Sequence, residues 1–95
     1  MWKGSGVMGE LCTIGSMKIT MRFRDTQQHH KPHVHAHCDG CDASVGVDGE
    51  ILAGSLPVKQ MKILVGWLAL HEEEVYAAWE LAVQGKHFSK IEVKL

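Results

Sequence analysis

The chain lacks the features that would assign it to a membrane, to a disulfide-bonded scaffold or to a strongly charged class. No apolar run approaches the roughly 18 residues that cross a bilayer, so we expect no membrane partner. Three cysteines, an odd number, argue against a disulfide framework and, with no visible secretion signal, favour a cytoplasmic location. A formal net charge of −1 excludes gross attraction to nucleic acid, which would need a local basic patch.

The 95 residues, 45% of them hydrophobic, allow one modest domain. The N-terminal stretch is Gly-rich and weakly patterned. We therefore expect a flexible tail over residues 1–12, with Met8 as an alternative start, and a single domain over residues 13–95. A short edge strand over residues 10–15 is the open alternative for the end of this tail.

Alternating apolar and polar residues predict three strands. Met17–Arg24 alternates strictly, and two further runs, His33–Cys38 and Cys41–Val47, flank Asp39-Gly40. That dipeptide favours a two-residue type I′ turn. The turn fixes a register in which Cys38 opposes Cys41, and it places these polar side chains on one face of the sheet: His33, His35, His37, Asp42, Ser44 and Asp48.

Asp48-Gly49 predicts another turn, and residues 51–56 predict a fourth strand whose register is open. A two-residue loop would turn Leu52 toward the core. A three-residue loop with a bulge would turn Ile51 and Ala53 inward, and we favour this second arrangement.

Two helices are predicted after Pro57, a residue suited to a helix start. An unbroken helix over residues 57–84 would be about 40 Å long, so we expect a break near His71, where three glutamates mark a new helix start. The first helix is apolar on nearly all sides, which predicts cover by the sheet and by a second helix or another subunit. The fold class is α+β: a three- or four-stranded antiparallel sheet followed by two helices packed on one face.

The run Lys31-Pro32-His33-Val34-His35 resembles the P-P-H-V-H signature of the DUF4160 family, small bacterial proteins with a domain of unknown function. Lys31 stands where the family usually has proline. The resemblance continues through Gly49–Pro57, Leu70–Glu73 and Trp79–Leu81, and spans about residues 13–93. It implies no established activity. Members are often encoded beside another small protein, which resembles toxin–antitoxin organisation and is associational only.

The alternating histidines suggest a metal site. His33, His35 and His37 would share one strand face at a spacing of about 7 Å. His33 and His35 would hold one ion, with His37, His29 or Asp42 as the third ligand. Imidazole suits a transition metal such as zinc. The alternative is a solvated strand face without metal. Because side chains alternate along a strand, Cys38 and Cys41 would lie on the opposite face from the histidines. A metal site shared by the cysteines and the histidines would need a bulge or break in the hairpin.

Catalysis and anion binding are the other hypotheses for this face. His37 beside Asp42, with His35 and Arg22, would suit metal-independent RNA cleavage by general acid–base chemistry; the alternative is a wet-surface ion pair. Basic residues that could contact phosphate are Arg22, Arg24 and Lys31. The face lacks aromatic residues for stacking bases, which leaves nucleic-acid binding weakly supported.

Whether the protein is an enzyme stays open at this stage. We favour a binding or regulatory module that acts through the His-rich face and the apolar helix. Its partner would be another protein or a second copy, contacted through the helices.

Overall fold

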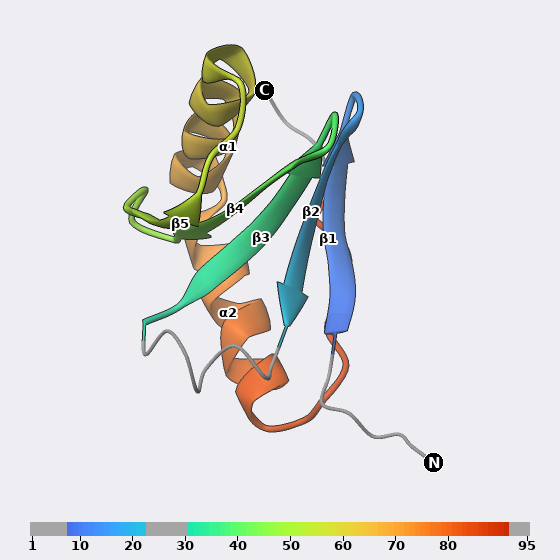
Figure 1. The fold of residues 1–95 in the computed structure, drawn as a ribbon. Coiled ribbons are helices and arrows are strands. Elements are labelled where there is room, and N and C mark those ends of the chain that lie inside the picture. Colours follow the sequence, from blue (N-terminus) through green and yellow to red (C-terminus); the bar gives the residue numbers. More distant parts are fainter. Residues whose placement is uncertain (1–7, 23–30, 92–95) are drawn as a thin grey trace.

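The chain folds into one antiparallel sheet backed by two helices (Figure 1). The computed structural model describes residues 8–22 and 31–91. The five strands lie side by side in sequence order, and both helices follow them in the chain: β1 (Met8–Ile14), β2 (Met17–Arg22), β3 (His33–Cys38), β4 (Cys41–Gly46), β5 (Ile51–Gly54), α1 (Val58–Leu70) and α2 (Glu72–Val83). Neither helix is both long and apolar enough to span a bilayer.

The predicted α+β class is confirmed, but the sheet has five strands where three or four were expected. The additional strand is β1, whose first residues fall within the predicted tail. Leu11 and Cys12 are buried in the core, and the Ile91 N–H donates a hydrogen bond to the Leu11 carbonyl at 2.8 Å. The C-terminal segment thus packs on β1 through Ile91, whose apolar side chain suits a docked tail. The tail boundary at residue 12 was therefore placed too late.

The hairpin of β3 and β4 has the predicted register. Asp39 and Gly40 have φ values of 52° and 79°, as a type I′ turn requires. Cys38 pairs with Cys41 across the turn, and each further pair follows in step. The apolar residues of both strands consequently share one face, and the side chains of Val34, Ala36, Cys38, Ala43 and Val45 are buried there.

That apolar face forms the core together with the helices. The alternating residues of β2 contribute Met17, Ile19 and Met21, each at most 1% exposed. The helices contribute Leu64, Trp67, Leu68, Val75, Ala78, Trp79 and Ala82. Figure 1 shows both helices on the same side of the sheet, so within the described residues no helix lies on the opposite side of β2, β3 and β4.

The favoured register of the fourth predicted strand is wrong. Ile51 is 53% exposed and Ala53 is also exposed, whereas Leu52 is partly buried. The pairing of β4 with β5 shifts between Ser44 and Val45, so that Ala53 lies opposite Ser44 while Ile51 lies opposite Val45. This irregularity brings Ala53 to the histidine-bearing face of the sheet.

The helix break at His71 is confirmed, because this one residue separates α1 from α2. His71 is 4% exposed, and its ring lies 5.1 Å from that of Trp67 between centroids. Its Nδ1 lies 2.7 Å from the Glu74 carboxylate in the first turn of α2. The imidazole therefore packs on the end of one helix while it contacts the start of the next.

Candidate functional site

The side of the sheet opposite the helices carries polar side chains from three strands. Strand pairing places Lys18, His37 and Asp42 in one row across β2, β3 and β4. A neighbouring row contains Thr20, His35 and Ser44. We call these six residues the polar sheet face. The sequence predicted its β3–β4 half, because a two-residue turn sets every cross-strand pair of that hairpin.

His37 and Asp42 form the first polar pair on this face. The His37 Nδ1 lies 2.8 Å from an Asp42 carboxylate oxygen, and the side chains are 59% and 74% exposed. When Nδ1 donates its hydrogen to the carboxylate, Nε2 is the ring nitrogen left for proton transfer. The His37 imidazole is thus oriented by the Asp42 carboxylate, as the sequence predicted, and both side chains are exposed to solvent.

His35 and Ser44 form the second pair, which borders a pocket. The Ser44 hydroxyl lies 3.3 Å from His35 Nδ1. An open pocket of about 400 Å³ is lined by His35, Asp42, Ala43, Ser44, Ala53 and Gly54. The two β5 residues are small and leave space beside the imidazole. Sequence reasoning missed this pocket, because the favoured register turned Ala53 toward the core.

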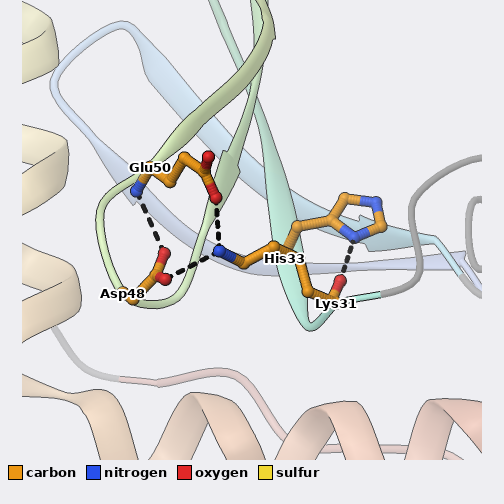
Figure 2. Close-up of polar contacts among 4 residues, drawn as sticks. All are labelled: Lys31, His33, Asp48 and Glu50. Carbon is orange, nitrogen blue, oxygen red and sulfur yellow. Dashed lines mark hydrogen bonds and ion pairs between the residues drawn. The ribbon is translucent and has the colours of Figure 1, made fainter.

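His33 differs from the other two strand histidines, because it is only 1% exposed. Its Nδ1 lies 2.9 Å from the Lys31 carbonyl (Figure 2), and its ring lies 5.1 Å from that of Trp79. His33 is the first residue of β3, and its ring lies where Trp79 of α2 packs against the end of this strand. Strand alternation placed His33 on the polar face with His35 and His37, but tertiary packing buries its ring.

The zinc hypothesis stays a prediction. Within residues 8–22 and 31–91, no group of three or more His, Cys, Asp and Glu side chains is arranged to hold a metal ion. The rings of His33 and His35 lie 5.6 Å apart in an edge contact, and His37 Nδ1 is engaged by Asp42. Cys38 and Cys41 are free thiols of the apolar face. His29 and His30 lie outside the described residues.

Lys31, predicted to bind anions, contacts two carboxylates instead. Its ammonium lies 2.7 Å from Asp48 and 2.5 Å from Glu50 (Figure 2). Hydrogen bonds to Asp48 and then Glu50 raise the pKa of Lys31 to about 12. The bond from Lys31 lowers the pKa of Asp48. The Lys31 charge is thus compensated locally. Of the other two predicted anion ligands, Arg22 ends β2, and Arg24 lies outside the described residues.

A second surface lies where β5 meets α1, and it is apolar. Ile51, Val58 and Val65 are 53%, 71% and 36% exposed. With Leu56 and Met61 they line most of an open groove of about 690 Å³, whose remaining lining residues are Ser55, Lys62 and Gly66. We call Ile51, Leu56, Val58, Met61 and Val65 the α1–β5 patch. The sequence predicted an additional cover for α1, and no described residue supplies it.

Comparison with known families agrees with these elements. The family model described as Domain of unknown function (DUF4160) matches residues 17–80. The chain belongs to the DUF4160 family. The DUF4160 match runs from the start of β2 into α2, so it includes the polar sheet face and the α1–β5 patch. No curated protein and no solved structure matches the chain.

Proposed function

We propose that this DUF4160 protein is a binding module that docks another protein surface on the α1–β5 patch. The observation that supports the proposal is the exposure of Ile51, Val58 and Val65 along one open, largely apolar groove. Large apolar patches on small proteins mark interaction sites, because their removal from water is favourable.

The composition of α1 supports the same proposal. One side of this helix already supplies Leu64, Trp67 and Leu68 to the core. Val58 and Val65 lie on another side of the helix, where they remain 71% and 36% exposed. A helix with apolar residues on both sides is typically covered on both. The three free thiols fit a reducing compartment, so we place this docking in the cytoplasm.

The test is partner capture with a matched control. We would immobilise the wild-type chain, a Val58→Glu/Val65→Glu variant and a Val83→Glu variant, since Val83 is a 44% exposed residue outside the patch. We expect wild type and Val83→Glu to retain the same specific partner and the double variant to lose it. Equal retention by all three folded proteins would reject the patch as the docking surface.

A second candidate function, proton-transfer catalysis on RNA, is favoured by the 2.8 Å contact of His37 with Asp42 beside the His35 pocket. The oriented imidazole would act as general base on the ribose 2′-hydroxyl that attacks the adjacent phosphorus, or as general acid on the 5′-oxygen that leaves as the P–O5′ bond breaks. RNA should then be cleaved in the presence of a chelator by wild type, but not by a folded His37→Ala variant. Absence of cleavage by the wild type, or cleavage by both proteins, would reject this candidate.

A further inference from the structure

We infer that the partner on the α1–β5 patch is a second copy of this chain, packed antiparallel along α1 about a two-fold axis. The inference rests on the proposed function, because it names the occupant of the same patch. A two-fold interface uses one surface twice, so that surface must be complementary to itself. The α1–β5 patch and its flanks meet this condition in charge and in shape.

Charge complementarity is the main argument. The exposed lysines Lys59 and Lys62 lie in the first two turns of α1, and Glu72 and Glu73 lie exposed just beyond its C-terminal end. None of these four side chains forms an ion pair with any residue in 8–22 or 31–91. Antiparallel packing brings the basic end of one copy to the acidic end of the other, at both ends of the interface at once.

The position of the axis follows from the spacing of these charges. Gly66 lies seven residues after Lys59 and seven residues before Glu73, so an axis beside Gly66 makes Lys59 of each copy face Glu73 of the other. Lys59 would then lie about 10 Å from the axis along α1. The His71 break adds one residue between the helices and leaves α2 on the same side of the sheet as α1 (Figure 1).

The shape of α1 at this point allows close approach. A Cβ atom added at Gly66 would meet no atom within 4 Å, and Ala69, one turn later, is exposed. Small side chains let two helices approach toward the short end of the usual 8–10 Å axial separation. Val58 and Val65 beside them would then be removed from water. An unrelated partner helix of one charge would match only one end of this surface.

The first experiment measures mass in solution. Sedimentation equilibrium of the untagged full chain, over a range of concentrations, should show reversible dimerisation, and Val58→Glu/Val65→Glu should be a folded monomer. Val83→Glu should dimerise like the wild type. A wild type that stays monomeric over the whole range would overturn the inference.

The second experiment tests orientation by charge reversal. Lys59→Glu/Lys62→Glu makes the exposed helical surface acidic at both ends, and Glu72→Lys/Glu73→Lys makes it basic at both ends. Each variant alone should dimerise about tenfold more weakly than wild type, because like charges then face each other. An equimolar mixture should form a heterodimer. Failure of the mixture to recover association would overturn the antiparallel arrangement.

The two experiments separate this inference from the proposed function. A monomeric wild type that still captures a different protein, and loses it in Val58→Glu/Val65→Glu, would retain the docking surface but reject the second copy as its occupant. A dimer that survives Val58→Glu/Val65→Glu would reject the patch and the inference together.

Discussion

The ammonium group of Lys31 lies 2.7 Å from the carboxylate of Asp48, seventeen residues away in the chain. This ion pair, with Glu50 as a second acceptor, ties the segment before β3 to the turn between β4 and β5 (Figure 2). The contact is near two backbone bonds of the same region, from Val47 N–H to the Pro32 carbonyl and from Gly46 N–H to the Glu50 carbonyl. It helps to place β5, and therefore the pocket and the α1–β5 patch.

Loss of this ion pair should change how stability depends on pH. The pKa of Lys31 is raised from 10.5 to about 12, so its contribution is present below pH 10.5 and is lost as pH rises through 12. The pKa of Asp48 is lowered from 3.8, so its contribution is present above that pH and is lost on further acidification. Lys31→Met should therefore be less stable than wild type mainly between these limits.

Urea unfolding at several pH values measures this difference. Lys86→Met is the control, because Lys86 is exposed and has no ion pair within the described ranges. The measurements are made at about pH 3, 7 and 12, of which only the middle value lies well within the range where both groups are charged. A stability difference for Lys31→Met that is the same at all three values would contradict the role of charge.

Gly54→Ala should destabilise the protein strongly. Gly54 has a φ of 72°, and an added Cβ would lie 2.1 Å from the backbone oxygen of Asp42. We expect the free energy of unfolding to fall by about 2 kcal/mol or more, because the backbone strain at positive φ and the steric overlap with Asp42 add. Gly66→Ala is the matched control, and it should raise stability by up to about 1 kcal/mol through helix propensity.

Both glycine variants should be measured in the Val58→Glu/Val65→Glu background, which is expected to be monomeric, so that self-association does not enter the unfolding curves. Thermal and urea unfolding of the pair would report the two effects. Equal stability of the two variants would show that the backbone at Gly54 can relax, and that β5 is not fixed against Asp42.

The strand histidines should separate into one structural residue and one surface residue. His33→Ala removes a 1% exposed ring that contacts Trp79, and should cost about 1–3 kcal/mol. His37→Ala removes an exposed ring and should change the free energy of unfolding by at most about 0.5 kcal/mol. Urea denaturation followed by tryptophan fluorescence measures both. A larger cost for His37→Ala would contradict this assignment.

The difference between the buried His33 and the other two strand histidines determines which variant tests the zinc prediction. Elemental analysis should use protein purified without an affinity tag or nickel column, and the comparison should be His35→Ala/His37→Ala, which spares the buried His33. If the predicted site exists, near-stoichiometric metal in the wild type is lost in this variant. Metal that remains in the variant, or is absent from the wild type, would reject the strand histidines as its ligands.

Thiol reactivity should be ordered by burial. Cys38 and Cys12 are 0% and 4% exposed, whereas Cys41 is only partly buried. Burial also raises the pKa of the Cys12 thiol and lowers its thiolate fraction. One rapid modification, located at Cys41 by mass spectrometry, is expected in native protein, with all three cysteines reacting after unfolding. Rapid modification of Cys12 would indicate that β1 opens readily.

Local pattern determined much of this fold before any tertiary contact was known. The Asp39-Gly40 turn set the pairs Cys38–Cys41 and His37–Asp42, because a two-residue turn leaves no freedom of register. Helical spacing and the glutamates after His71 located both helices and the break between them. The strict alternation of β2 identified its core face.

Tertiary structure decided the rest, since those features depend on segments far apart in the chain. β1 joins the core because Ile91 and the other core residues cover it, and His33 is buried because Trp79 of α2 reaches the end of β3. Lys31 meets Asp48 and Glu50 only when the two hairpins come together. The sequence determines which residue types are present near the pocket and the α1–β5 patch. The β4–β5 irregularity and the docking of α1 decided which of them remain exposed, because exposure depends on packing of the whole chain.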